Sequence, residues 1–468
     1  MIEGSTAAAA ATSELSEGQR KLLFWACFAA LVATSFCFVT RSMLISTWGT
    51  EFGWNETQKG QILGVGLWPF SISIILFSLV VDRIGYGTAM VFAFLCHILF
   101  AAVTIMAPSM GSPQSIYMAF YFGSLLGALA AGTVEAVINP VVATLFPREK
   151  VKWLSILHAG WPGGLVLGGI LAIGLGDADW KIKIGLIFIP TIIYGVFMLG
   201  RKFPIHERVA AGVSYRDMLR EFGVIVALIA SFLVFKEIGR VFSFPEWLTW
   251  TLIVVATLAY GSATGFALGR GLFIVLVLIM MPLATTELGT DTWVTDLMGP
   301  EMEKLGLQAG WILVYTSLIM MILRFLAGSI VHRLSPLGLL SIAAALAMIG
   351  LFFLSSAVGA AILIAATVYG IGKTFFWPAM LGVVSEQFPR GGAMTLNGVS
   401  GLGMLAVGTV GAVFLGYIQD SSVNSKLKAE NQAIHQQVAV EKTWVFGKYE
   451  AVDPAKVEKL PEKADKDE

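Results

Sequence analysis

The sequence predicts an all-α polytopic membrane protein with two pseudo-symmetric helix bundles and two inserted spans between them. Three observations lead to this fold class. Of the 468 residues, 56% are hydrophobic and only 13% are charged, whereas a soluble domain carries about 25% charged residues. Thirteen apolar runs are long enough to cross a bilayer. Two short charged landmarks of the first part of the chain recur in the second part.

Each apolar run is expected to be a helix, because an open strand edge leaves backbone groups without hydrogen bonds in lipid. A span needs about 20 mostly apolar residues. The candidate spans are 22–47, 60–81, 87–107, 116–146, 153–175, 181–200, 222–241, 248–268, 271–297, 310–331, 336–356, 359–387 and 393–418.

Basic residues predict the orientation, because Lys and Arg gather in cytoplasmic segments. Fourteen of them lie in one set of alternate segments, and few lie in the opposite set. The fourteen are Arg20, Lys21, Arg83, Arg148, Lys150, Lys152, Arg201, Lys202, Arg208, Arg216, Arg220, Arg270, Arg333 and Arg390. The N-terminus is therefore expected in the cytoplasm and the polar tail outside.

The repeated landmarks predict the domain organisation. SLVVDRIGYG (78–87) resembles GSIVHRLSPL (328–337), and Phe-Pro-Arg occurs at 146–148 and again at 388–390. In each half the first landmark follows the second helix, and the Phe-Pro-Arg landmark follows the fourth helix. The predicted segments are a cytoplasmic N-terminal segment (1–21), a six-helix bundle (22–200), a cytoplasmic linker (201–221), an inserted helix pair (222–268), a second bundle with five spans (269–419) and an external tail (420–468). For the linker we favour a solvated segment over a regulatory or partner surface. For the second bundle we favour a last span that is missing from this sequence over a protein that works with an incomplete second half.

Several function classes are disfavoured by composition and motifs. The formal net charge is zero, so nothing predicts a nucleic-acid surface. The three cysteines lie in apolar runs, without the spacing of a metal site. The sequence contains no phosphate-binding loop motif, so it gives no indication of an ATP-driven pump. We therefore expect no enzyme activity, no cofactor and no metal.

Two motifs carry a resemblance to known transporters. SLVVDRIGYG, with Asp82, Arg83 and Gly85, is similar to the loop motif between helices two and three of the major facilitator superfamily. The second copy keeps Gly328 and Arg333 and has His332 for the acid. The resemblance implies a major facilitator type fold and a conformational latch on the cytoplasmic side; a generic tight turn is the alternative.

Within that superfamily, EAVINP resembles the Glu-x-x-x-Asn-Pro signature of the fucose–galactose–glucose:proton symporters. The match falls on Glu135, Asn139 and Pro140, and it implies a glutamate active in proton coupling and sugar binding. ATTELGTDTW similarly resembles their helix-seven stretch, with Glu287 and Trp293. Those symporters carry an aspartate in helix one, where this chain reads VTRSMLI.

Intramembrane polar residues are expected to face the bundle interior. Glu135 and Asn139 are four residues apart and share a helix face. Glu135 precedes Pro147 by twelve residues and His158 follows it by eleven, so at about 1.5 Å per residue both lie at a similar depth. A proton could pass between them, because an apolar environment brings a carboxyl group toward titration near neutral pH. The alternative is that the two side chains form structural hydrogen bonds.

Other intramembrane charges have two interpretations each. Lys373 and Trp377 would contact the solute, or Lys373 would pair with a helix-seven acid. Glu287 is a candidate for the site, whereas Asp291 is expected at a solvated external mouth. Arg41 contacts substrate or forms an ion pair. We expect a further base, Arg324, to snorkel or to form an ion pair near the cytoplasmic face.

The sequence thus predicts a secondary active transporter, a proton-coupled symporter of a small polar solute such as a sugar, working by alternating access. A transporter or uniporter of an organic anion, and a non-transporting membrane receptor or scaffold, remain open. The expected partners are the solute, protons and the lipid bilayer. The expected form is a monomer in a bacterial inner (plasma) membrane.

Overall fold

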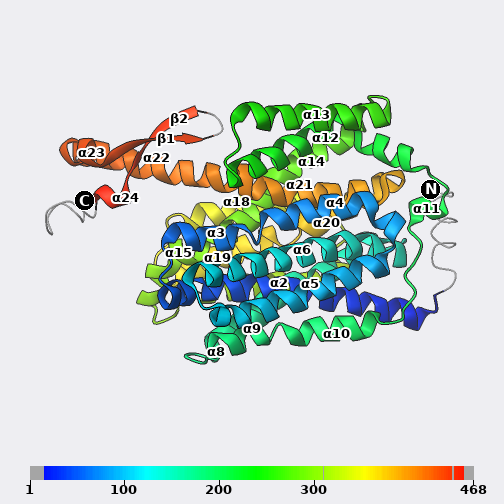
Figure 1. The fold of residues 1–468 in the computed structure, drawn as a ribbon, viewed down its shortest axis with the longest axis horizontal. Helices are drawn as coiled ribbons and strands as arrows, with labels where there is room; N and C mark the ends of the chain where they lie inside the picture. Colours follow the sequence, from blue (N-terminus) through cyan, green and yellow to red (C-terminus); the bar gives the residue numbers. More distant parts are fainter. Residues whose placement is uncertain (1–14, 309, 332, 445–446, 458–468) are drawn as a thin grey trace.

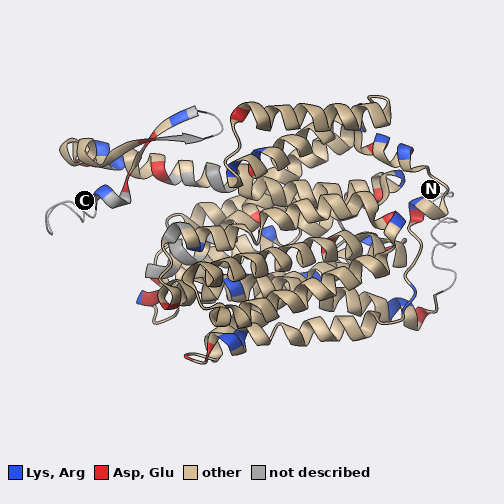
Figure 2. Ribbon diagram, viewed as in Figure 1, with Lys and Arg blue, Asp and Glu red and all other residues tan. Residues whose placement is uncertain are grey.

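The structure is a computed structural model, and it describes residues 15–308, 310–331, 333–444 and 447–457. Long helices run side by side along the longest axis of the molecule, and the first and last described residues lie at opposite ends of that axis (Figure 1). Charged residues gather near the helix ends, and the middle of the bundle is largely uncharged (Figure 2).

Helices that precede the linker form the first half. Ser16 caps the first of them with a capping box, which satisfies orphan backbone donors and starts the helix before the apolar run begins. The elements are α2 (Glu17–Phe52), α3 (Glu56–Gly64), α4 (Trp68–Ile84), α5 (Tyr86–Met106), η1 (Ala107–Met110), α6 (Pro113–Leu145), α7 (Lys150–His158), α8 (Gly160–Gly174), α9 (Trp180–Gly185) and α10 (Phe188–Met198).

A short helix of the linker, α11 (Glu207–Ala210), leads to the inserted pair, α12 (Tyr215–Val241) and α13 (Glu246–Thr264). The pair lies on one flank of the bundle, with α13 outermost (Figure 1). A non-helical residue, Gly223, kinks α12 near its start. The helix α12 packs against α14 and α21 of the second half.

The second half repeats the helical pattern and ends in the tail. Its elements are α14 (Gly271–Ala284), η2 (Thr285–Gly289), α15 (Thr290–Lys304), α16 (Trp311–Phe325), α17 (Ala327–Val331), α18 (Pro336–Leu354), α19 (Ala361–Lys373), α20 (Phe376–Gln387), η3 (Pro389–Gly391), α21 (Gly392–Ala406), η4 (Val407–Gly411), α22 (Ala412–Glu430), α23 (Gln432–Val438), β1 (Ala439–Trp444), β2 (Gly447–Val452) and α24 (Pro454–Val457).

The described residues contain twelve helices that are long and apolar enough to cross a membrane, and Trp311–Phe325 is a shorter apolar helix. The prediction of an all-α polytopic protein with about thirteen spans is therefore confirmed. The tail adds one feature that hydropathy did not predict, an antiparallel hairpin of β1 and β2. It follows α22, which extends beyond the bundle (Figure 1).

Several spans are interrupted near their middle, and these interruptions position the polar residues. Thr374 and Phe375 separate α19 from α20, and a π-helical turn, η2, follows α14. In contrast, α6 continues through Pro140, because the helix tolerates the loss of one backbone hydrogen bond when neighbours cover it. Breaks and π-turns change which side chains face inward.

Candidate functional site

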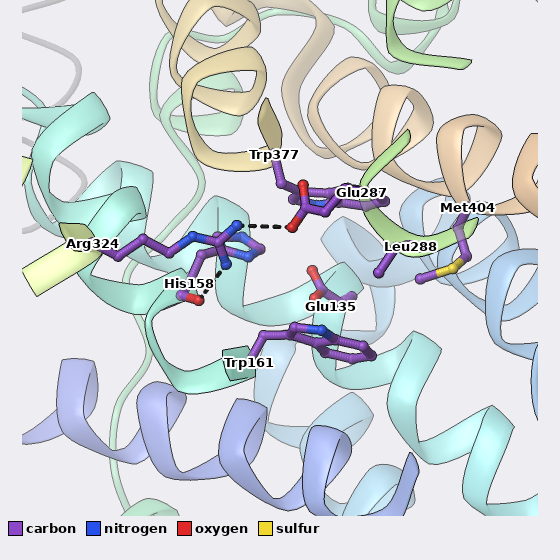
Figure 3. A pocket seen from close by; sticks show the side chains of 8 residues that line it. All are labelled: Glu135, His158, Trp161, Glu287, Leu288, Arg324, Trp377 and Met404. Carbon is purple, nitrogen blue, oxygen red and sulfur yellow. Dashed lines mark hydrogen bonds and ion pairs between the residues drawn. The ribbon is translucent and has the colours of Figure 1, made fainter. Parts of the chain in front are cut away.

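A cavity lies between the two halves, near the middle of the helices. The space between its atoms amounts to about 300 Å³, including the part that is open to solvent. The described residues contain no group of three His, Cys, Asp or Glu side chains placed to hold a metal ion. The cavity is lined by Glu135, His158, Trp161, Glu287, Leu288, Arg324, Trp377 and Met404 (Figure 3).

The first half contributes a chain of three hydrogen-bonded side chains. Asn139 Nδ2 donates to Glu135 Oε2 at 2.8 Å, and Asn139 Oδ1 lies 2.9 Å from His158 Nε2. Because the amide oxygen can only accept, His158 Nε2 carries the hydrogen. The structure therefore brings together the carboxylate and imidazole that sequence spacing placed at one depth, and it adds Asn139 as the bridge.

The second half contributes a buried ion pair. Arg324 Nη2 lies 2.9 Å from Glu287 Oε1, and the two side chains are 1% and 3% exposed. The guanidinium also donates to the carbonyl of His158 at 2.8 Å and to that of Thr374 at 2.7 Å. Arg324 thus joins three interrupted spans and connects the two halves.

The expected position of Arg324 near the cytoplasmic face is wrong. Its guanidinium lines the central cavity instead, because Glu287 and two backbone carbonyls hold it there. One sequence signal could have found it: a buried acid at Glu287 needs a compensating charge, and Arg324 lies in the next span.

Lys373 is outside the central cavity. It is fully buried, forms an ion pair with Asp291, and lies over the ring of Tyr369 with Nζ 5.0 Å from its centroid. Of the two interpretations of Lys373, the structure therefore shows the ion pair with an acid of helix seven. The expectation that Asp291 lies at a solvated mouth is wrong, because its side chain is 10% exposed.

Two tryptophans line the cavity from opposite halves. Trp377, which the sequence singled out, and Trp161, which it missed, lie on either side of the carboxylate of Glu135, and the carboxylate of Glu287 overlaps the ring of Trp377 in this view (Figure 3). Trp377 Nε1 and Glu287 Oε2 are buried without a hydrogen-bond partner in the structure. Such groups are costly when unpaired, so the cavity offers a donor and an acceptor to a polar ligand. The side chain of Trp293 lies outside the described residues.

The family is decided by a match over most of the chain. Residues 25–412 match the model of the Major Facilitator Superfamily. The chain belongs to the major facilitator superfamily. It is therefore an integral membrane protein with a transporter fold, as the loop motif indicated.

Solved structures of major facilitator proteins share the fold. The proton:xylose symporter XylE bound to 6-bromo-6-deoxy-D-glucose has a TM-score of 0.60 at 16% identity, covering 88% of this chain and 91% of that one. The transporter FucP in the outward conformation has 0.54 at 15%, covering 89% and 94%. A mutant of the nucleoside transporter NupG has 0.51 at 13%, covering 85% and 91%. No curated protein matches the sequence.

Arg41, in this major facilitator chain, lies in α2 and outside the central cavity. It lines a second cavity, which shares Trp161 with the first. Its side chain is buried, and its Nε atom has no hydrogen-bond partner. Of the two interpretations of Arg41, the ion pair is not present among the described residues.

The loop motif of the first half contacts the linker. Asp82 accepts two hydrogen bonds from Arg208, at 2.6 and 3.1 Å, and both side chains are nearly fully buried. The guanidinium of Arg83 lies 3.9 Å from the ring centroid of Tyr215. Gly85 has a φ of 84°, which L side chains rarely adopt. The latch residues therefore tie the linker and the start of α12 to the first half.

The second copy of the motif does not form the same contacts. Gly328 lies against the side chain of Lys152, Arg333 is exposed, and His332 lies outside the described residues. The copies thus share sequence landmarks but differ in their surroundings.

The expectation of a solvated linker is wrong for its middle part. His206, Glu207 and Arg208 pack between the motif and the start of α21, and Glu207 pairs with Lys150 at 2.7 Å. Burial lowers the pKa of His206 to about 4. Its Nδ1 accepts a hydrogen bond from the backbone of Arg208, which fixes the linker turn.

Proposed function

We propose that this major facilitator protein is a secondary transporter that couples protons to a small polar solute, such as a sugar, by alternating access. The observation that supports it most is the Glu135–Asn139–His158 chain at the cavity between the halves. An intramembrane carboxylate with a hydrogen-bonded route to an imidazole is a typical proton-relay arrangement. The fold shared with a proton:xylose symporter agrees with this proposal.

The solute binds between Trp161 and Trp377. Aromatic faces stack on the apolar faces of a ring, and polar groups at the ring edge fix its orientation. The unpaired Trp377 Nε1 and Glu287 Oε2 are the donor and acceptor for that edge. Because Trp161 and Trp377 come from opposite halves, the solute contacts both halves at once.

Proton binding at Glu135 changes the charge of the cavity by one unit. With Glu135 ionised, the cavity contains two carboxylates and one guanidinium; with Glu135 protonated, the Arg324–Glu287 pair is the remaining charge pair. Loss of an unpaired charge lowers the cost of closing the cavity away from water. Coupling follows if the halves rearrange more readily with Glu135 protonated and solute bound.

The remaining assignments belong to the same proposal. The segments 22–200 and 269–419 move as the two halves, and 222–268 is carried beside them. The N-terminus is cytoplasmic and the tail external, as the basic segments favour, in a bacterial inner (plasma) membrane. The protein works as a monomer, and its partners are the solute and protons.

Uptake into vesicles tests the proposal. The full chain is reconstituted in proteoliposomes and assayed with a panel of sugars and organic acids, with and without an imposed pH gradient. We expect gradient-driven accumulation of a panel solute by the wild type. Glu135→Gln should abolish that accumulation and retain solute exchange, whereas the exposed-carboxylate control Glu303→Gln should retain both.

Two results contradict the proposal. Accumulation by Glu135→Gln equal to wild type would refute the coupling role of Glu135. Absence of any uptake or exchange across the panel by the folded wild type would favour a non-transporting receptor or scaffold.

A further inference from the structure

The second cavity contains a buried guanidinium without a counter-charge. The space between its atoms amounts to about 240 Å³, including the part that is open to solvent, and it lies between α2, α4, α6 and α8. Arg41 lines it with Thr34, Phe38, Phe70 and Trp161. The described residues around this cavity include no acid, in contrast to the central cavity with Glu135 and Glu287.

Arg41 differs in this respect from every other buried cation in the described part of the chain. Its side chain is 2% exposed, and the contact that the structure gives it is with the ring of Phe38, 5.9 Å from Cζ to the centroid. The other four buried Lys and Arg side chains each have a carboxylate partner. They are Lys150, Arg208, Arg324 and Lys373, paired with Glu207, Asp82, Glu287 and Asp291.

The protein backbone holds the guanidinium in place. Gly66 lies in the break between α3 and α4, and a Cβ atom at this position would overlap Cζ and both terminal nitrogens of Arg41. The planar group therefore lies on bare backbone that only glycine provides. This position leaves the guanidinium beside the cavity, because no side chain of residue 66 covers it.

Physical chemistry then identifies the missing group. A buried charge without a partner costs several kcal/mol, and the planar fork of an arginine matches a carboxylate with two parallel hydrogen bonds. The acids that line the neighbouring cavity would repel a second negative charge, but they accept hydrogen bonds from hydroxyl groups. A ligand that satisfies both cavities therefore carries one anionic group and a hydroxylated body.

We propose that the transported solute is a small hydroxylated monocarboxylate, such as a sugar acid, whose carboxylate binds Arg41. This inference rests on the transport function proposed above. It changes the substrate class from a neutral sugar to an organic anion. Trp161 lines both cavities, so a ligand that extends past the edge of its ring contacts Arg41 with its carboxylate and the central cavity with its hydroxyl groups.

Binding to the purified full chain, without membrane or gradient, tests the substrate class separately from transport. The ligands are matched pairs that differ by one carboxylate: glucose and glucuronate, galactose and galacturonate, with inorganic phosphate and chloride as further anions. We expect an acid of at least one pair to bind the wild type at least tenfold more tightly than its neutral sugar. Arg41→Gln should lose roughly 10- to 100-fold of that affinity, as expected for a hydrogen-bonded charge pair.

Two variants separate binding from folding. Arg41→Lys keeps a positive charge and loses the planar fork, so it should fold and bind the acid at least fivefold more weakly. Lys21→Gln, an exposed control, should bind as the wild type. If Arg41 binds substrate, Arg41→Gln without ligand should unfold at the same or a higher temperature than wild type, because an uncompensated buried charge is removed.

The following results would overturn the proposal. They are tighter binding of the neutral sugars, equal acid affinity in Arg41→Gln and wild type, a preference for phosphate or chloride over both sugar acids, or no binding of any acid. A lower unfolding temperature of ligand-free Arg41→Gln would assign Arg41 a structural role. Failure of gradient-driven accumulation with intact, Arg41-dependent acid binding would instead refute the coupling proposal alone.

Discussion

Replacing Arg208 by Met should destabilise the protein more than any exposed charge change on the same side. The Arg208–Asp82 contact is a buried ion pair with side chains 6% and 3% exposed. Removing one partner of such a pair leaves an uncompensated charge and costs about 3–5 kcal/mol. For a unit of about 200 residues, 1 kcal/mol shifts the unfolding temperature by about 2–4 °C, so we expect a decrease of at least roughly 6 °C.

A double-mutant cycle separates the pair from the loss of each side chain. Asp82→Asn should be destabilising by itself, and Asp82→Asn with Arg208→Met should recover part of the loss, because both charges are then gone. The expected coupling energy is about 2–3 kcal/mol. The control is Lys21→Met, which removes the exposed Glu17–Lys21 pair and should cost less than about 1 kcal/mol.

A thiol-reactive dye provides the assay. The three cysteines, Cys27, Cys37 and Cys96, are free and buried, so labelling during a temperature ramp reports unfolding. The scan rate must be equal for all variants, because membrane proteins often unfold irreversibly. Additive effects of Asp82→Asn and Arg208→Met, each below about 0.5 kcal/mol, would refute the role of this pair in holding the linker.

Three further predictions concern other contacts. The lowered pKa of His206, about 4, means that the unfolded chain binds more protons between about pH 6.5 and 4; the free energy of unfolding should therefore fall by up to about 3 kcal/mol as the pH is lowered through this range, and His206→Asn should flatten this slope in denaturation curves from pH 7.5 to 4.5. Gly223→Ala should lower stability by about 2 kcal/mol or more in the dye assay, because φ is 79° and the new Cβ would overlap the backbone of Gly269; wild-type stability would contradict the strained kink. Lys373→Met should cost about 3–5 kcal/mol, and adding Asp291→Asn should restore stability and keep solute binding; loss of binding in the stable double variant would place Lys373 in the site.

The sequence predicted the spans well because the bilayer imposes a simple requirement on them. About 20 apolar residues and satisfied backbone groups leave little choice but a helix. It predicted helix ends less well: α2 begins at Glu17 and ends at Phe52, beyond the apolar run 22–47, because caps and polar turns extend helices outside the lipid. The strands β1 and β2 were not predicted, since their mixed charges weaken the alternating pattern of a strand.

Part of the candidate site was predictable because the depths of two of its residues in the membrane could be counted from the same landmark, Pro147. Glu135 and His158 flank Pro147 at similar spacing, and the structure joins them through Asn139. Trp161 was missed because a tryptophan in an apolar run carries no signal of its own. The partner of Asp82 was missed because Arg208 lies 126 residues away in a polar segment, and sequence alone does not bring such segments together.

The inserted pair also bridges the two halves at one flank of the bundle. Near its start α12 packs on α21 through Phe222 and Gly398, and at its other end Phe242 lies 6.1 Å from Trp68 of α4, centroid to centroid. The pair therefore covers the line where α4 and α21, one from each half, meet. The same two helices from opposite halves, α4 and α21, are therefore bridged by α12 at two levels, so a change in the angle between the halves has to alter at least one of these two contacts.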